Sequence, residues 1–270
     1  MAILDAGAVR DLLSREARDR LDQLETFADI DSTNSYLMQL PGPPPGRMSI
    51  AATTNQTAGR GQRGRAWVSP PGSGVCLSLA YTYDKQPQNL SALTLAMGVS
   101  AINALEALDI KGVQLKWPND LVANDGKLGG ILTEAQQQST GAVTVVTGIG
   151  VNVRLPEAIP TDAGSSWARQ IVDLASLHEL LPTYDAIAAS LISHMLGAFL
   201  DFEGVGFALY TERWRPYDWL IGREVVVDVT GERVEGIASG VAENGELLVA
   251  TEQTGTRLIT SGSVVLAGRA

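Results

Sequence analysis

The sequence predicts an α+β protein with two domains of unequal size, a larger one over residues 1–220 and a smaller one over residues 221–270. Strand-like and helical runs are intermixed up to about residue 220, whereas short β-rich runs separated by glycine turns follow Gly222. A chain of 270 residues also suits one mid-sized domain with a small companion. Several short strands in so small a unit are typical of a small β-barrel.

Hydrophobic periodicity places the elements in order. Residues 1–22 alternate apolar and charged side chains at helical spacing and predict one short helix. Residues 31–34 (Asp-Ser-Thr-Asn) supply N-cap side chains for a second short helix. The Asn-Asp-Gly turn at 124–126 predicts a hairpin that joins strands at 113–117 and 127–134. The other expected elements are strands at 24–30, 48–54, 75–83 and 142–153, helices at 90–108, 184–202 and 206–214, and strands of the smaller domain at 224–229, 234–241, 247–251 and 256–266.

The composition argues against several classes of protein. The formal net charge is −10, and because general nucleic-acid binding needs clustered lysine and arginine on phosphates, we expect no DNA partner. No uninterrupted apolar run reaches the roughly 18 residues of a membrane span, and the N-terminus has no signal-peptide pattern. The single cysteine, Cys76, cannot form an internal disulfide, which fits a reducing compartment. We therefore expect a cytoplasmic protein without a membrane partner.

One long segment contains no acidic residue. Residues 32–83 hold neither aspartate nor glutamate, although 30 acids are spread over the chain, and three arginines (Arg60, Arg63 and Arg65) cluster there. One interpretation of this pattern is that it arises by chance on a surface rich in loops. Clustered positive charge without competing carboxylates, however, stabilises phosphate, so the segment is a candidate site for an anionic ligand.

The loop at residues 56–74 opens with Gln-Thr-Ala-Gly-Arg-Gly-Gln-Arg-Gly-Arg. Its glycines let backbone N–H groups approach a ligand closely, and its arginines are bidentate donors for phosphate or carboxylate. It lacks the Gly-Lys-Ser/Thr of a P-loop, and no long helix follows it as in a dinucleotide fingerprint. We interpret it as a lid over an anionic intermediate, with a plain flexible loop as the alternative.

A second motif reads Lys116-Trp-Pro-Asn-Asp120 and is followed by Lys127. Pro118 cannot donate to a strand ladder, so pairing should stop there and the chain should leave the sheet, presenting Asn119 and Asp120. Asp120 is then a candidate ligand for Mg²⁺ or for a ribose hydroxyl. Lys127 is a candidate to neutralise charge on a carboxylate–phosphate centre. Alternatively, Lys116 and Lys127 only flank a surface hairpin.

A third motif, Gly148-Ile-Gly150-Val-Asn152, lies in the predicted strand at 142–153. Glycine inside a strand marks either a bulge or a close approach by a ligand or another backbone. Asn152 is a candidate to hydrogen-bond a purine or a triphosphate.

Taken in order, these motifs resemble the signatures of biotin–protein ligases. They are Ser32-Thr-Asn, Gln56-Thr-Ala-Gly-Arg-Gly, Lys116-Trp-Pro-Asn-Asp, Lys127-Leu-Gly-Gly-Ile-Leu and Gly148-Ile-Gly-Val-Asn. The likeness covers residues 24–153 and continues more weakly through Trp214. It implies a mixed-sheet catalytic domain of the biotin/lipoate ligase type with a small C-terminal SH3-like β-barrel. Because few residues precede the first strand, it also implies the ligase-only type without an N-terminal DNA-binding domain.

The resemblance further implies a reaction and its residues. Biotin and ATP, with Mg²⁺, would form biotinyl-5′-AMP, and the biotinyl group would pass to a lysine of a biotin carboxyl carrier protein domain; the enzyme would be a monomer or a weak homodimer. The implied biotin-binding residues are Ser32, Thr33, Asn34, Gln56, Gly59, Lys127, Gly129, Gly148 and Gly150. The implied ATP- and adenylate-binding residues are Arg60, Gly61, Arg63, Arg65, Trp67, Lys116, Asn119, Asp120, Asn152 and Trp167. Lys127 and Arg60 are the implied catalytic residues, Asp120 is the candidate Mg²⁺ ligand, and Trp167 either stacks on adenine or packs in the core.

The sequence departs from the family pattern at Gln62, where many relatives have an arginine that helps hold the lid. This implies faster loss of the intermediate, unless Arg63 or Arg65 replaces that grip. A lipoate- or octanoate-transferring relative is the nearest rival, and a cysteine acyl transferase would need Cys76, which is expected in a strand. A biotin-responsive DNA-binding repressor is the rival of a different class. A carrier protein is excluded by the lack of a Met-Lys-Met turn.

Overall fold

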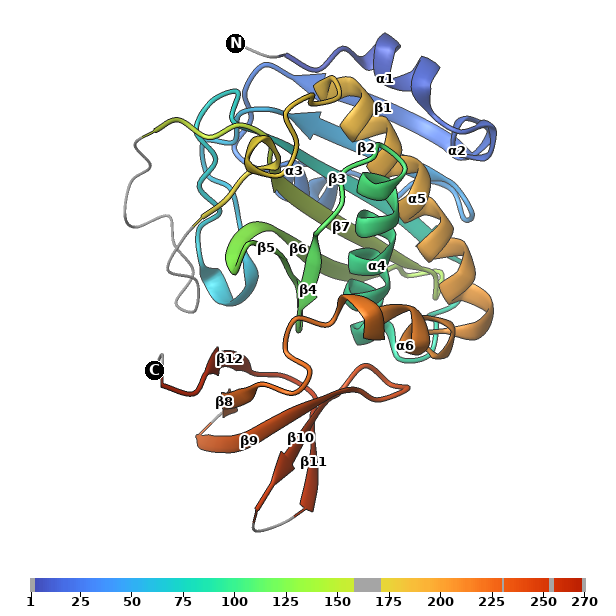
Figure 1. The fold of residues 1–270 in the computed structure, drawn as a ribbon. Helices are drawn as coiled ribbons and strands as arrows, with labels where there is room; N and C mark the ends of the chain where they lie inside the picture. Colours follow the sequence, from blue (N-terminus) through green and yellow to red (C-terminus); the bar gives the residue numbers. More distant parts are fainter. Residues whose placement is uncertain (1–2, 158–170, 230, 253–254, 269–270) are drawn as a thin grey trace.

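The computed structural model describes residues 3–157, 171–229, 231–252 and 255–268. Its larger part is built on a seven-stranded sheet in the order β1-β2-β3-β7-β6-β5-β4 (Figure 1). β1 pairs with β2 in parallel, and the other neighbours are antiparallel, so the sheet is mixed as expected. The strands are β1 (Leu21–Phe27), β2 (Met48–Thr53), β3 (Gly74–Tyr83), β4 (Gln114–Lys116), β5 (Asp120–Ala123), β6 (Gly126–Gln137) and β7 (Val143–Asn152).

Two hydrophobic clusters show how the sheet is covered. Successive residues of β2 alternate between them: Ile50 and Ala52 belong to the large core, whereas Ala51 packs with Leu37 of the helix α3. The long helices α4 and α5 lie together over the large-core face, and α3 lies over the other (Figure 1). The helices are α1 (Ala6–Leu12), α2 (Arg15–Arg20), α3 (Thr33–Gln39), α4 (Leu93–Glu106), α5 (Tyr184–Val205) and α6 (Ala208–Trp214). Part of the second face is therefore not covered by helices and is open to a binding site.

Two expectations about local structure in the larger part were wrong. Residues 1–22 form two helices because the Ser14 side chain accepts the N–H of Ala17 and caps a new helix. The chain also does not leave the sheet at Pro118. It reverses there through a cis peptide bond, and β5 returns with Lys116 opposite Asp120. Pro118 has no backbone N–H to donate, and because it lies in the turn between the strands, no hydrogen bond of the ladder is lost. The turn at 124–126 therefore joins β5 to β6, and β5 is a strand that periodicity alone did not reveal.

The helix α5 is long and apolar enough to cross a membrane by length and composition alone. However, 56% of its apolar window is buried inside the protein, and it packs against α4, α1 and β3. These contacts are those of a helix at the centre of a core.

The C-terminal part is an antiparallel sheet in the order β11-β10-β9-β8-β12. The strand expected at 256–266 is two strands, because residues 255–259 pair with 247–251 whereas residues 263–266 pair with 225–228 at the opposite edge of the sheet. Gly262 lies in the connection, where a Cβ would come within 2.6 Å of Val227 Cγ1. Hydrogen bonds join this part to the larger part of the chain, among them Trp117 Nε1 to the carbonyl of Gly245 (3.0 Å) and Asn89 Nδ2 to Asn244 Oδ1 (2.7 Å). Its strands are β8 (Glu224–Val229), β9 (Glu232–Val241), β10 (Leu247–Thr251), β11 (Gly255–Ile259) and β12 (Ser263–Leu266).

Candidate active site

A cavity of ≈ 310 Å³ opens on the sheet face that α4 and α5 leave uncovered. Its walls come from the start of α3, the 56–67 loop, the β4–β5 turn, β6, β7 and residues 262–264 of the C-terminal domain. Most of the predicted site residues line it: Ser32, Thr33, Asn34, Gln56, Arg60, Gly61, Arg63, Arg65, Trp67, Lys116, Asn119, Asp120, Lys127, Gly148 and Gly150. The fold thus brings together motifs that are up to about 120 residues apart in sequence.

One end of the cavity is a neutral hydrogen-bonding network. The side chain of Ser32 caps α3, and the amide and hydroxyl of Thr33 both donate to Gln56 Oε1, at 2.8 and 3.2 Å. The hydroxyl of Ser78, on β3, lies 2.7 Å from Thr33 Oγ1 and 2.6 Å from Asn34 Oδ1. These contacts hold five polar side chains in fixed directions before any ligand arrives, which reduces the ordering cost of binding.

The glycines of β7 have a specific steric role. A Cβ on Gly148 would lie 2.1 Å from Asn34 Oδ1, and a Cβ on Gly150 would lie 2.5 Å from Trp67 Cε2. Both positions therefore need glycine because side chains from other segments lie directly on the strand. Gly148 makes room for Asn34, and Gly150 makes room for the indole ring of Trp67.

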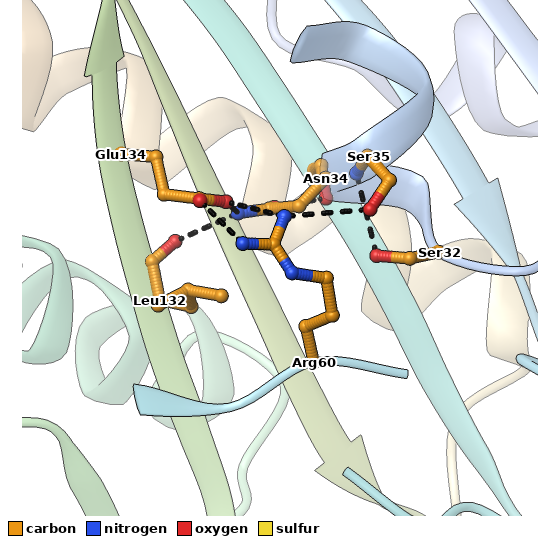
Figure 2. Close-up of polar contacts among 7 residues, drawn as sticks. Ser32, Asn34, Ser35, Arg60, Leu132 and Glu134 are labelled. Atoms are coloured by element: carbon orange, nitrogen blue, oxygen red, sulfur yellow. Dashed lines mark hydrogen bonds and ion pairs between the residues drawn. The ribbon is translucent and has the colours of Figure 1, made fainter. Parts of the chain in front are cut away.

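Arg60 is held by a carboxylate that the sequence did not point to. Its Nη2 and Nη1 donate to Oε1 and Oε2 of Glu134 on β6, at 2.7 and 3.2 Å (Figure 2). Asn34 Nδ2 donates to the same carboxylate at 3.0 Å, and Ser35 Oγ lies 3.4 Å from Arg60 Nη1. This bidentate pair ties the 56–67 loop to the sheet. The absence of acids in residues 32–83 gave no hint of it, because the partner acid lies on another strand.

The other end of the cavity is cationic. Lys127 Nζ lies 2.7 Å from Asp120 Oδ1, and Lys116 Nζ lies 3.9 Å from Asp120 Oδ2. Arg63 and Arg65 also line this end. Five basic side chains therefore face the cavity, against Asp120 on its lining and Glu134 beside Arg60. This balance favours an anionic ligand.

Lys116 is almost completely buried, with 2% of its surface exposed. Burial lowers the pKa of Lys116 from 10.5 to about 8, Asp120 opposes this shift, and the positive charges of Lys127 and Arg65 add to it. Its ammonium group is therefore an unusually costly charge that an anion in the cavity would stabilise.

The donor set does not fit a Mg²⁺ ion held by the protein alone. Asp120 has a lysine ammonium near each of its oxygens, and the described residues contain no group of three His, Cys, Asp or Glu side chains that could hold a metal. Mg²⁺ prefers six oxygen ligands and commonly enters such sites on nucleotide phosphates. In this arrangement Asp120 orients Lys127 and Lys116.

Three of the predicted site residues that the structure describes, Gly59, Gly129 and Asn152, are not on the cavity lining. Gly59 and Gly129 have no room for a Cβ because backbone carbonyls of Trp67 and Gly150 lie at 2.4 and 2.5 Å, so they are required for local packing. Asn152 is buried and donates to the carbonyl of Val172 at 3.0 Å. Trp167 lies outside the described residues.

The sequence analysis missed other residues that support or line the cavity. Ser78 and Glu134 support the cavity, and residues 262–264 reach it from the C-terminal domain. For Glu134 a signal existed: on β6 it shares the face of Gly130 and Leu132, at alternate positions. For residues 262–264 no signal existed, because their approach depends on how the two sheets pack.

Cys76 is buried in β3, as expected. Burial raises the pKa of its thiol to about 11. A thiol of this kind is protonated near neutral pH and is a poor nucleophile, so the structure gives no support to a cysteine acyl transferase.

Comparison with known proteins agrees with this geometry. The family model of the biotin/lipoate A/B protein ligase family matches residues 26–152, and that of the biotin protein ligase C-terminal domain matches residues 220–267. The chain is 31% identical to the biotin–[acetyl-CoA-carboxylase] ligase of Mycobacterium tuberculosis, over 97% of this chain and 95% of that protein. It is 34% identical to the bifunctional ligase/repressor BirA of Escherichia coli, over 84% of this chain and 68% of that protein.

Among solved structures, a biotin protein ligase from Aquifex aeolicus in complex with biotin and ATP matches with a TM-score of 0.73 and 25% identity, covering 92% of this chain and 98% of that one. The mixed sheet with its C-terminal β domain is thus the architecture of the biotin/lipoate ligase class, which confirms the predicted fold class. Within that class, the chain belongs to the biotin protein ligase family.

The Arg60–Glu134 pair predicts the behaviour of the loop at 59–67. Glu134→Gln removes a partly exposed bidentate ion pair, which contributes up to about 1 kcal/mol. Amide exchange in the loop, measured by hydrogen-exchange mass spectrometry, should therefore accelerate about fivefold. The matched control is Glu25→Gln, which removes an exposed carboxylate bonded to Tyr36 and should not change the loop. Unaltered exchange in Glu134→Gln would show that the pair does not hold the loop.

The buried Lys116 predicts a pH-dependent stability. Its pKa is lower in the folded protein, so between about pH 8 and 10.5 the unfolded chain binds the extra proton and stability rises with pH. Lys116→Met removes this dependence. Urea unfolding at pH 7 and pH 10 should show the stability of wild type relative to Lys116→Met improving by about 2–3 kcal/mol at the higher pH. A difference that is constant with pH would mean that Lys116 is not desolvated.

Proposed function

We propose that the chain is a biotin–protein ligase that forms biotinyl-5′-AMP from biotin and Mg·ATP and passes the biotinyl group to a lysine of a biotin carboxyl carrier protein domain. The observation that carries this proposal is the single cavity that joins a neutral polar end, at Thr33 and Gln56, to a cationic end, at Lys116 and Lys127. Biotin has a neutral ureido ring at one end and a carboxylate at the other, so one ligand suits both ends.

In the first step a carboxylate oxygen of biotin attacks the α-phosphorus of ATP, a new P–O bond forms, and the P–O bond to pyrophosphate breaks. Two anions must approach each other, so positioning and charge neutralisation dominate the chemistry. Lys127, oriented by Asp120 at 2.7 Å, neutralises the centre where carboxylate and phosphate meet. Arg63 and Arg65 bind phosphate from the loop. Mg²⁺ enters as part of the Mg·ATP substrate and helps neutralise its phosphates.

In the second step the amine of the carrier lysine, after losing a proton to solvent, attacks the acyl carbon of the adenylate. A C–N bond forms, the C–O bond to the phosphate breaks, AMP leaves with that electron pair, and the remaining proton departs as the nitrogen becomes an amide. No side-chain nucleophile is needed. The chain's contribution is to exclude water and to position the acceptor.

The biotin ring is assigned to Ser32, Thr33, Asn34 and Gln56, with Gly148 and Gly150 shaping the floor of the cavity. The role of Arg60 is revised: its guanidinium is engaged by Glu134, so it holds the loop in place and the phosphate contacts fall to Arg63 and Arg65. Gln62 lines the cavity and supplies no charge there. Its effect on retention of the adenylate stays a prediction, as do the nucleotide contacts of Asn152 and Trp167.

Lipoate or octanoate is the alternative acyl substrate, since the matching family includes lipoate ligases. The polar network around Thr33 favours biotin, because the ureido ring can hydrogen-bond to these groups, whereas an aliphatic octanoyl chain would remove them from water without offering a hydrogen bond. The buried Cys76 also suits a protein that works in a reducing cytoplasm.

The proposed reaction predicts that the release of pyrophosphate depends on biotin. Purified protein with Mg·ATP should release pyrophosphate when biotin is added and not when biotin is omitted, because the carboxylate of biotin is the attacking group. Parallel assays with lipoate and octanoate should give no release above background. If either acid supports release and biotin does not, the assigned substrate is wrong.

The role of Lys127 predicts a rate effect larger than a binding effect. Lys127→Ala should slow biotin-dependent pyrophosphate release by about 10²–10³, because one preorganised charge at the reacting oxygens is lost. Biotin affinity, measured by calorimetry, should fall less than the rate does. The matched control is Lys85→Ala, which removes an exposed lysine and should leave both values unchanged. Near-normal release by Lys127→Ala would exclude Lys127 from catalysis.

A further inference from the structure

A second cavity of ≈ 270 Å³ lies where the C-terminal domain meets the catalytic domain. The two cavities share four lining residues, namely Gln62, Arg63, Pro118 and Gly262, so they are neighbours. The second one is bounded by the start of α4, the β4–β5 turn, and residues 244–246 and 260–262 of the C-terminal sheet. The reaction described above does not use it.

The β4–β5 turn separates the two cavities. Lys116 and Asp120 line the first cavity, Trp117 lines the second, and Pro118 lines both. Anything seated in the second cavity therefore lies one turn of chain away from the two lysines of the first. The turn is rigidly placed, since Trp117 is buried and its Nε1 donates to the carbonyl of Gly245.

The hairpin that carries residues 244–246 is held closely against α4. Asn244 accepts from Asn89 at 2.7 Å. Gly245 has a φ of +83°, and a Cβ there would lie 2.7 Å from the Cβ of Ala92, so only glycine fits. Glu246, the next residue, is thus placed in the wall of the second cavity by fixed contacts.

The chemistry of the second cavity differs from that of the first. Glu246 Oε2 is a buried carboxylate oxygen with no hydrogen-bond partner among the described residues. Much of the rest of the wall is neutral and polar, including Asn89, Ser91, Thr94 and Ser261. An unsatisfied buried carboxylate oxygen is costly, and a cationic N–H donor relieves that cost most effectively. Arg63 lines both cavities, but a phosphate beside Glu246 would be repelled by its carboxylate, so we assign the triphosphate of ATP to the first cavity.

We propose that the second cavity receives the acceptor lysine, and that the Glu246 carboxylate binds its ammonium group before transfer. This rests on the proposed function, in which a lysine must reach the acyl carbon held near Lys127. A lysine side chain is a narrow apolar stem with a cationic tip, and it needs a channel beside the first cavity that ends on an acid. Glu246 binds the ammonium form, and the amine attacks after one proton is lost to solvent, as described above. Glu246 is thus a positioning residue for the acceptor.

The test separates acceptor binding from adenylation. Enzyme loaded with biotinyl-5′-AMP is mixed either with the carrier domain of a biotin-dependent carboxylase or with hydroxylamine, a small nucleophile that is uncharged at neutral pH. Glu246→Gln keeps the size of the side chain and removes its charge. We expect the KM for the carrier to rise about ten- to a hundredfold, as expected for one lost charge-assisted hydrogen bond. Transfer to hydroxylamine and biotin-dependent pyrophosphate release should be unchanged.

Two further variants act as controls. Glu243→Gln removes an exposed carboxylate on the same hairpin, away from the cavity lining, and should behave as wild type. Glu246→Asp retains the charge and should recover part of the carrier affinity. An unchanged KM for the carrier in Glu246→Gln overturns the proposal, as does an equal slowing of both acceptors or a loss of pyrophosphate release. Wild type that releases no pyrophosphate with biotin would instead refute the proposed function itself.

Discussion

The site depends on a part of the sheet face where glycines leave the strands without side chains. On β6 and β7, Gly130, Gly148 and Gly150 occupy alternate positions on the side that α4 and α5 leave uncovered. Asn34 and Trp67 lie directly on two of these glycines, from segments far away in sequence. A β-carbon at either position would displace the side chains that shape the cavity. The hydrogen-bonding network, the 56–67 loop and the cationic end of the cavity all depend on this strand surface being free of side chains.

Around that surface, Arg60, Lys116 and Lys127 each lie beside a carboxylate, and the basic side chains on the lining still outnumber the acidic ones. Glu134 engages Arg60, and Asp120 is shared by Lys116 and Lys127. Each carboxylate fixes the direction of a basic group without neutralising the cavity. The buried ammonium of Lys116 remains costly, and an incoming anion reduces that cost. The chain thus keeps the charged groups of this cavity oriented at some expense in stability, a common property of active sites.

The C-terminal domain completes both cavities. It contributes residues 262–264 to the first and two loops to the second, and Trp117 and Asn89 hold it in place. Our proposals assign adenylation and acceptor binding to adjacent cavities that share Arg63, the first with four further basic side chains and the second with the half-buried Glu246. In these proposals, the polyphosphate of ATP and the ammonium group of the acceptor lie on different sides of the β4–β5 turn.

Local patterns in the sequence determined most of the elements and the membership of the site. The periodicity of β2, β3 and β7, the capping side chain of Ser32 and the glycine-rich motifs are all short-range features, and the described cavity gathers nearly all of the predicted residues. Only the tertiary structure decided which groups pair. Arg60 and Glu134 are 74 residues apart, and Glu246 reaches its cavity from another domain. Such contacts depend on strand order and domain packing, and no periodicity or spacing within one segment encodes those.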